Sequence, residues 1–283
     1  MYKNKVVFFS SKLHRGGAEM HLVKLCNELV KKDINIEIVV TQRKGDYEKM
    51  LSSDIKLHYP KLNFKFYTLA LFNGLLVLNK VIKKNDIDLV CSIQDGPNVI
   101  NLLNKSLNEK YIPRMIIVQN NPKALKNTLS GRLIFTALTK LYKKTDAFVS
   151  LSQGVANCYK KLLNYKSEID VIPNISNVNK QKTIIKKHTV NSPIKLITVG
   201  RLEEQKNFPF MFKALAYILN EYEDFKFHLT ILGNGTKKDE LYSLCEKLNI
   251  VDSVSFEGFV EDTSSYYRNA DLFLLSSKWE GFG

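Results

Sequence analysis

Two cations flank the end of one apolar run in the C-terminal half of the sequence. In the segment Val199–Asn207, VGRLEEQKN, Arg201 follows the run directly and Lys206 comes five residues later. A guanidinium fork and an ammonium point charge held beside one strand end can clamp a diphosphate. The alternative is an ordinary surface loop, in which these cations pair with Glu203 and Glu204.

Glycine-rich turns follow other apolar runs along the chain. Gly16 and Gly17 stand just before a helical pattern, where glycine lets the backbone approach a phosphate that the helix N-terminus faces. The segments 231–235 (ILGNG), 258–262 (GFVED) and 279–283 (WEGFG) have the same character. Each segment is also compatible with a plain turn, so none of them decides a function singly.

The elements that must position these turns alternate between strands and helices. In the first part of the chain we expect strands at 5–10, 35–41, 89–93, 115–119, 147–151 and 170–172, and helices at 18–31, 98–107, 131–143 and 154–163. Such alternation predicts a parallel sheet with helices on both faces. In sheets of this kind, ligands bind at the carboxyl ends of the strands.

The alternation breaks at a polar stretch and then restarts. Residues 1–175 are expected to form one domain, 176–193 a linker, and 194–283 a second α/β domain. In the second domain we expect strands at 194–199, 227–232, 254–256 and 272–276, and helices at 208–219, 237–248 and 263–269. Only seven residues follow the last strand, so we expect a truncated domain that lacks a covering helix, rather than a small complete one.

Cysteine and histidine usage excludes several classes of protein. The four cysteines form no CxxC pair and the five histidines are scattered, so a zinc site of the usual spacing is not expected. The N-terminus lacks the apolar core and cleavage site of a signal peptide, and the longest apolar stretch, 64–78, is too short to span a bilayer. We therefore expect a cytoplasmic protein with reduced cysteines.

The positive charge is concentrated in the first domain. The chain carries +14 in all, but residues 1–190 hold 32 basic and 14 acidic residues, a net charge of +18, and the rest carry −4. This asymmetry predicts an anionic partner for the first domain. Nucleic acid is disfavoured because no RNA- or DNA-binding motif occurs, so an anionic membrane surface or lipid is expected.

One segment could make such a membrane contact. Residues 64–84, FKFYTLALFNGLLVLNKVIKK, are apolar and end in a basic cluster, Lys80, Lys83 and Lys84, as interfacial membrane helices do. An ordinary buried helix with a solvated basic end fits the same pattern.

Taken together, the turns resemble those of the retaining glycosyltransferases of family 4. These enzymes have the GT-B fold, two Rossmann-like α/β domains facing a cleft. The matching pieces are GGAE (16–19), SQG (152–154), VIPN (171–174), VGRLEEQKN (199–207), LGNG (232–235), GFV (258–260) and SSKWEGFG (276–283). The resemblance extends from about residue 5 to the last residue, and VGRLEEQKN and the terminal EGFG are its specific part. It implies a GT-B protein whose second domain is incomplete.

The resemblance also implies roles for particular residues. Arg201 and Lys206 match the pair that binds the donor diphosphate and stabilises its charge, so no metal or other cofactor is expected. Glu280 matches the first glutamate of the family's Glu-x7-Glu motif at the donor sugar, which completes the expected catalytic set. The donor-binding set adds residues from three loops, which are Gly16, Gly17, Gly258, Phe259, Val260, Gly281, Phe282 and Gly283.

Two departures from the family pattern are visible. The second glutamate of the motif would fall beyond Gly283. Many family members also carry a histidine in the loop that here reads Gln119, Asn120 and Asn121, and these amides bind hydroxyls but shuttle no proton. Asp95 is the nearest alternative polar residue.

The function implied is sugar transfer from a nucleotide diphosphate, UDP by expectation, to a glycan or a polyprenyl-diphosphate-linked acceptor. Assembly of a bacterial surface polysaccharide, lipopolysaccharide or capsule, would place the protein at the inner face of the cell membrane.

Two alternatives to this function remain open. One is another GT-B enzyme, such as a nucleotide-sugar epimerase, and the other is a non-catalytic fragment that binds nucleotide. An NAD-dependent enzyme is disfavoured because no GxGxxG follows the first strand.

Overall fold

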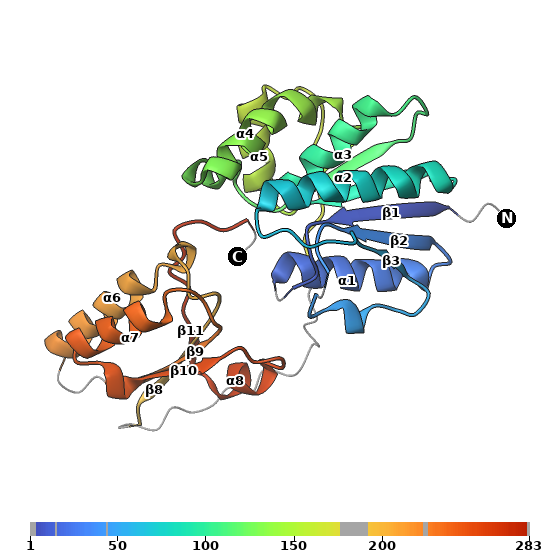
Figure 1. Ribbon diagram of the computed structural model, residues 1–283. Coiled ribbons are helices and arrows are strands. Elements are labelled where there is room, and N and C mark those ends of the chain that lie inside the picture. The colour runs from blue at the N-terminus through green and yellow to red at the C-terminus, as the bar shows by residue number, and fades with distance from the viewer. Residues whose placement is uncertain (1–3, 15, 44, 176–191, 223–225, 282–283) are drawn as a thin grey trace. The chain divides into compact units, whose positions relative to one another are not determined.

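The protein forms two α/β units (Figure 1). The computed structural model describes residues 4–14, 16–43, 45–175, 192–222 and 226–281. Its contacts assign residues 1–178 and 281–283 to the first unit and residues 179–280 to the second. The expected linker, 176–193, lies outside the described residues except for its last two positions.

The first unit is built on a seven-stranded parallel sheet with the order β3-β2-β1-β4-β5-β6-β7. Its strands are β1 (Lys5–Ser10), β2 (Asn35–Val40), β3 (Lys56–His58), β4 (Leu89–Ile93), β5 (Arg114–Val118), β6 (Ala147–Ser150) and β7 (Asp170–Val171). The sequence pattern missed only the short edge strand β3, because its three residues are part-exposed and carry no apolar run.

Helices cover both faces of this sheet, as the alternation predicted. They are α1 (Gly17–Val30), α2 (Tyr67–Lys84), α3 (Asp95–Leu107), α4 (Leu129–Leu141) and α5 (Gln153–Leu163). One apolar cluster joins α1 to the sheet through Leu22, Val23 and Cys26. A second cluster joins α2, α3, α4 and α5 to the opposite face (Figure 1). The interiors of the central strands are therefore buried on both sides, which explains their continuous runs of apolar residues, whereas the edge strands β3 and β7 are exposed or part-exposed.

The strand order reverses direction once within this sheet. The chain runs from β1 outward to β2 and β3, and then returns to place β4 on the other side of β1. The loops that follow β1 and β4 therefore leave in opposite directions and open a crevice at the carboxyl ends of the two strands.

The second unit repeats this plan on a smaller scale. Its parallel sheet has the order β10-β9-β8-β11, with β8 (Ile194–Val199), β9 (Phe227–Leu232), β10 (Val254–Gly258) and β11 (Leu272–Phe273). Apolar residues of α6 (Phe208–Glu221) and α7 (Lys238–Lys247) pack on the sheet around Phe212, Leu215 and Leu241, while α8 (Ser264–Asn269) contacts β8. The direction of the strand order reverses between β8 and β11.

The last strand is shorter than the apolar run 272–276 predicted. Only Leu272 and Phe273 pair with β8, although the Leu274 amide still donates to the Ile197 carbonyl at 2.8 Å. Beyond this point the Ser276 hydroxyl donates to the Lys206 carbonyl at 2.8 Å, so the chain leaves the sheet and follows the loop after β8 instead.

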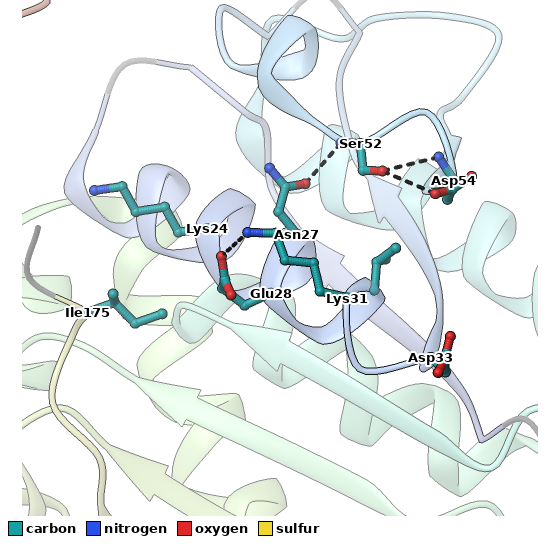
Figure 2. Close-up of a pocket in the computed structure, with 9 residues that line it drawn as sticks. Lys24, Asn27, Glu28, Lys31, Asp33, Ser52, Asp54 and Ile175 are labelled. Carbon is teal, nitrogen blue, oxygen red and sulfur yellow. Dashed lines mark hydrogen bonds and ion pairs between the residues drawn. The ribbon is translucent and has the colours of Figure 1, made fainter.

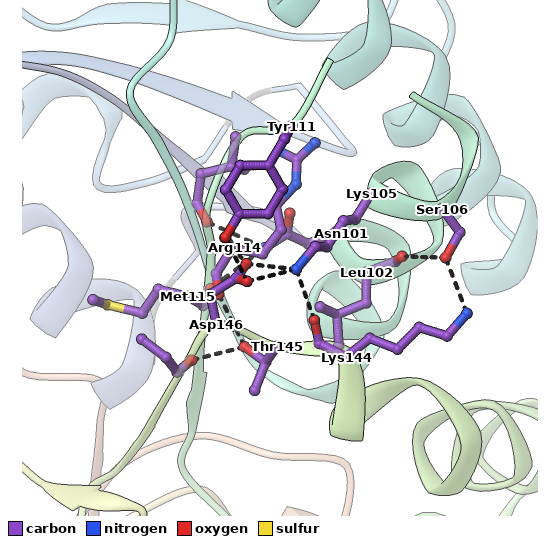
Figure 3. A network of polar contacts seen from close by, with 12 residues as sticks. Asn101, Leu102, Lys105, Ser106, Tyr111, Arg114, Met115, Lys144, Thr145 and Asp146 are labelled. Atoms are coloured by element: carbon purple, nitrogen blue, oxygen red, sulfur yellow. Dashed lines mark hydrogen bonds and ion pairs between the residues drawn. The ribbon is translucent and has the colours of Figure 1, made fainter. Parts of the chain in front are cut away.

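A polar network ties three elements together at the amino edge of the first sheet (Figure 3). The Asp146 carboxylate, just before β6, accepts hydrogen bonds from Lys105 of α3 at 2.6 Å, from the Tyr111 hydroxyl at 2.9 Å and from the Arg114 amide of β5 at 2.7 Å. Partial burial raises the pKa of Asp146, but these three hydrogen bonds outweigh it and hold the pKa below its ordinary value. The ionised form therefore stabilises the fold.

Replacing this carboxylate should destabilise the first unit in a pH-dependent way. We expect Asp146→Asn to lower the free energy of unfolding by about 1 kcal/mol at pH 7. Because the folded-state pKa is lowered, the difference should shrink as the pH falls below the ordinary value of 3.8. Urea unfolding at several pH values measures it. Asp86→Asn is the matched control, because that fully exposed carboxylate pairs with the exposed Lys110 on the surface. An equal effect of both changes would contradict the prediction.

Candidate active site

The loop after β8 carries the two expected diphosphate-binding cations. It forms a short 3-10 helix, η4 (Glu204–Lys206), and Asn207 then enters α6 in the left-handed region at φ 51°. The stem of Lys206 packs over Gly200, where a Cβ atom would lie 2.7 Å from the Lys206 Cε. The glycine therefore lets the lysine lie flat across the end of β8.

The structure brings Lys206 and Glu280 together. The Lys206 Nζ lies 2.6 Å from Glu280 Oε1, and each side chain is only about one-fifth exposed, at 22% and 23%. The second carboxylate oxygen, Oε2, accepts a hydrogen bond from Gln205 Nε2 at 3.2 Å. Two of the three expected catalytic residues therefore meet at the β8/β11 reversal.

Arg201, the third residue of this set, points into solvent. Its side chain is exposed and makes no hydrogen bond or ion pair with other residues in the described part of the chain. The alternative in which Arg201 and Lys206 pair with Glu203 and Glu204 is wrong. Glu203 instead accepts hydrogen bonds from the amide and hydroxyl of Thr236, and Glu204 pairs with Lys278 at 2.9 Å.

The turns after β9 and β10 close against the loop after β8. A Cβ atom on Gly233 would lie 2.0 Å from the Gly200 carbonyl oxygen, and Gly233 has a φ of +141°. Its amide donates to the Gly258 carbonyl at 2.6 Å, and Gly258 itself has a φ of +74°. Gly258, the part-exposed Phe259 and Val260 therefore border the same strand ends as Lys206.

In the first unit, the expected glycine turn lies at the start of α1. Gly17 is the first residue of the helix and Gly16 precedes it in an extended conformation, at φ −171°. A Cβ atom on Gly17 would meet nothing within 4 Å, so the helix N-terminus is open there. Next to it, the carboxylate of Glu19 folds back over Gly16 and is the group nearest to where a Cβ atom on that residue would lie.

Two successive side-chain hydrogen bonds connect this part of the first unit to the loop after β4. The Ser11 hydroxyl donates to Gln94 Oε1 at 2.9 Å, and Gln94 Nε2 donates to Glu19 Oε1 at 2.9 Å. Gln94 has a φ of 76°, which is rare for a residue with a side chain. A strained backbone conformation persists only where the surrounding structure stabilises it. At Gln94 this conformation places the side-chain amide at the β1/β4 reversal.

Asp95, the alternative polar candidate, starts α3 in a ring of tyrosines. Its Oδ1 accepts hydrogen bonds from the hydroxyl groups of Tyr142, at 2.7 Å, and Tyr159. Burial raises the pKa of Asp95, and the two hydroxyl donors oppose this shift. The hydroxyl of Tyr67 also packs close by, 2.3 Å from where a Cβ atom on Gly96 would lie.

The loop after β5 carries amide side chains at Gln119, Asn120 and Asn121. Gln119 is buried, at 6% exposure, and neither atom of its amide has a partner among the described residues. Asn121 lies two residues further along the chain, and its side-chain amide donates to the Cys158 sulfur at 3.7 Å. No proton-transferring side chain stands at these three positions.

The C-terminal glycine loop is described only in part. The Gly281 carbonyl accepts a hydrogen bond from the Ser152 hydroxyl at 2.7 Å, and Gly281 groups with the first unit. Phe282 and Gly283, also expected at the donor, lie outside the described residues.

A separate pocket lies beside the second half of α1 (Figure 2). Its lining alternates in charge, with Lys24, Glu28 and Lys31 from the helix, and Asn27 binds the Ser52 amide at 2.9 Å. This pocket is far along α1 from Gly17 and contains none of the expected site residues.

Over the residues that are described, no three His, Cys, Asp or Glu side chains gather as a metal site would require. Metal-independent chemistry stays a prediction.

Comparison with known protein families assigns the chain to a family. Residues 15–180 match the model of Glycosyltransferase Family 4, and residues 180–283 match that of Glycosyl transferases group 1. The chain belongs to glycosyltransferase family 4. The resemblance found in the turns and the expected GT-B fold are both confirmed.

Curated relatives of this family 4 chain are distant. It is 28% identical to an uncharacterized glycosyltransferase of Methanocaldococcus jannaschii over 71% of this chain and 53% of that protein. It is 26% identical to a Campylobacter jejuni enzyme over 98% of this chain and 76% of that protein. That enzyme is named N-acetylgalactosamine-N,N'-diacetylbacillosaminyl-diphospho-undecaprenol 4-alpha-N-acetylgalactosaminyltransferase. The chain therefore spans only about half of the first relative and three quarters of the second.

A solved relative shares the fold of the family 4 chain. The Anabaena protein HepE, in complex with UDP and glucose, superposes with a TM-score of 0.74 at 15% identity. The match covers 97% of this chain and 74% of HepE.

Several residues of the candidate site were not predicted from the sequence. Gln205, Glu19, Gln94 and the tyrosines around Asp95 lie far from their partners along the chain. Two of them had a signal, because Gln205 lies inside VGRLEEQKN and Glu19 inside GGAE.

The carboxyl group of Asp95 should make stability depend on pH. Because burial raises its folded-state pKa, the ionised form costs stability as the pH rises above the ordinary value of 3.8. We expect Asp95→Asn to gain stability relative to the unaltered chain between pH 4 and pH 7, as measured by urea unfolding. Tyr159→Phe, which removes one donor to the carboxylate, should steepen the dependence instead. A difference between Asp95→Asn and the unaltered chain that does not vary with pH would refute this assignment.

Proposed function

We propose that the protein transfers a sugar from a nucleotide diphosphate, UDP, to a hydroxyl of a glycan or lipid-linked acceptor, with retention at the anomeric carbon. The observation that carries the proposal is the meeting of Lys206 and Glu280 at the β8/β11 reversal, with the exposed side chain of Arg201 in the same loop as Lys206. The donor diphosphate would bind the two cations, and the sugar would lie against Glu280.

Charge stabilisation is the chemistry that this arrangement supports. When the bond between sugar and phosphate breaks, negative charge develops on the leaving diphosphate. Preorganised cations that meet this charge lower the barrier most when water is largely excluded. Lys206 is already mostly buried, while Arg201 is free to close on the phosphate. Gly258, Phe259 and Val260 border the neighbouring strand ends, where the proposal places the nucleotide base.

The first unit would bind the acceptor. Its β1/β4 crevice presents the Gln94 amide, the Glu19 carboxylate and the Asp95 carboxyl group. Amides and carboxylates bind sugar hydroxyls through hydrogen bonds. Gly16 and Gly17 would close over the donor phosphates in this proposal.

Similar proteins support both the proposed donor and the proposed acceptor. The named Campylobacter jejuni enzyme acts on a diphospho-undecaprenol substrate, and the HepE structure contains UDP and glucose. A lipid-linked acceptor and a UDP-sugar donor are therefore the first substrates to test.

The donor site predicts a selective loss of activity. We expect Arg201→Ala to lower sugar transfer from UDP-sugars by about a hundredfold or more, because a stabilising charge is removed from the leaving group. Its melting temperature should stay unchanged, because Arg201 has no partner in the described chain. Transfer of a radiolabelled sugar to a lipid-linked acceptor measures the rate, and NMR of the product gives the anomeric configuration. Lys213→Ala, on the exposed side of α6, is the control. Full activity of Arg201→Ala would remove the cation pair from the mechanism.

The exposed face of α2 supports membrane attachment. Phe66, Leu69, Phe72 and Leu76 lie on one side of the helix and are between 47% and 73% exposed. The basic cluster, Lys80, Lys83 and Lys84, continues toward its C-terminal end. The opposite face of α2 is buried through Leu71, Leu75 and Leu78, as expected for an ordinary buried helix.

No helix within the described ranges is long and apolar enough to cross a bilayer.

We propose that this α2 face attaches the protein to the inner face of the cell membrane, where anionic lipids attract lysine. Replacing Lys80, Lys83 and Lys84 by glutamine should weaken binding to vesicles of anionic phospholipid, by roughly 1 kcal/mol per lysine at low salt. Vesicle co-sedimentation measures the binding. Replacement of Lys160, Lys161 and Lys166, near the end of α5, is the matched control. Unchanged binding of the α2 variant would exclude this face.

A further inference from the structure

The Glu280 carboxylate is bound through both of its oxygens, by two neighbouring residues of η4. Lys206 takes Oε1 at 2.6 Å, and Gln205 Nε2 takes Oε2 at 3.2 Å. The same Gln205 nitrogen donates to the Trp279 carbonyl at 3.0 Å. Gln205 thus holds both the side chain and the backbone of the segment that carries the glutamate.

The segment 276–280 is joined to η4 by further contacts that do not involve Lys206 Nζ. The Ser276 hydroxyl donates to the Lys206 carbonyl at 2.8 Å, and the Lys278 amide donates to the Gln205 carbonyl at 2.8 Å. The Lys278 ammonium pairs with Glu204 at 2.9 Å. Withdrawal of the Lys206 ammonium would therefore leave Glu280 in place, because Gln205 and the backbone still hold it.

The ammonium of Lys206 is thus neutralised by Glu280 before any ligand arrives. Both side chains remain about one-fifth exposed, so a ligand can reach the pair from solvent. A diphosphate carries more negative charge than one carboxylate and offers more acceptor oxygens, so it competes for the ammonium. Arg201 has no side-chain partner among the described residues. Of the two cations, Lys206 is therefore the one that must exchange a carboxylate partner for the diphosphate.

We propose that Glu280 occupies Lys206 in the donor-free protein and that the donor diphosphate displaces it. The carboxylate, kept in position by Gln205, is then free to accept a hydrogen bond from the donor sugar. Gln205 is a positioning residue in this scheme, and Glu280 becomes available only after the diphosphate has bound. The inference rests on the donor site proposed above and adds the order in which its parts become available.

Displacement of a carboxylate implies that Glu280 weakens diphosphate binding. Isothermal titration of the full chain with UDP, and separately with inorganic diphosphate, measures this directly. We expect Glu280→Gln to bind both ligands about two- to fivefold more tightly, the range expected for loss of a part-exposed ion pair. Glu280→Ala should also increase the affinity for both ligands. Agreement of the two variants shows that the increase does not come from a local rearrangement around the glutamine.

Two comparisons separate pair exchange from a general effect of charge. Glu204→Gln removes an equal charge from η4, but its partner is Lys278, so UDP affinity should stay unchanged. In a Lys206→Ala background, the gain from Glu280→Gln should vanish, because no ammonium remains to be released. Melting temperatures establish that each variant is folded.

The positioning role of Gln205 has its own signature. We expect Gln205→Met to lower kcat for sugar transfer about tenfold while the UDP affinity changes less than twofold, because Oε2 loses its donor but Lys206 remains. A purely structural role would lower the melting temperature and the UDP affinity together.

The outcomes distinguish this inference from the proposed function. If the unaltered chain binds UDP and Glu280→Gln binds it no more tightly, the exchange is overturned while the donor site stands. A gain that persists in the Lys206→Ala background overturns the exchange as well. If neither UDP nor inorganic diphosphate binds the unaltered chain, the proposed donor site fails instead.

Discussion

The site depends on one topological constraint that occurs twice. In a parallel sheet all carboxyl ends lie at one edge, and loops leaving neighbouring strands usually run the same way. Where the strand order reverses, at β1/β4 and again at β8/β11, two loops diverge and leave a crevice between them. The polar residues of each unit gather at its reversal. Gln94 meets Glu19 in the first unit, and Lys206 meets Glu280 in the second.

The two crevices differ in their electrostatic character. The first presents the Gln94 amide and the Glu19 carboxylate, which suit neutral hydroxyl-bearing ligands. The second presents Lys206 and Arg201, which suit a diphosphate. The net charge of the first unit is nevertheless strongly positive, so its basic residues must act elsewhere than in the crevice. The lysines of α2 lie on the outside of the helix layer, beside exposed phenylalanines.

Glycine has a definite structural task at two positions of the second unit. Gly200 makes room for the stem of Lys206, and Gly233 lies against the carbonyl of Gly200 with a φ that side chains rarely adopt. A methyl group at Gly233 would separate the loops after β8 and β9. The close approach of these loops is therefore part of what places the lysine over the strand end.

The sequence by itself determined the strands, the helices and the family. Continuous valine and isoleucine runs mark strands buried on both faces, and the cations of the segment Val199–Asn207 predict a diphosphate-binding loop. Tertiary structure alone decided the partners, because they come from residues far apart in the chain. Lys206 sits two to three residues from Glu203 and Glu204, yet it pairs with Glu280, 74 residues away. The strand order places β11 beside β8, and no local pattern encodes that order. The same holds for Asp95, whose tyrosine donors arrive from α5 and from the turn after α4.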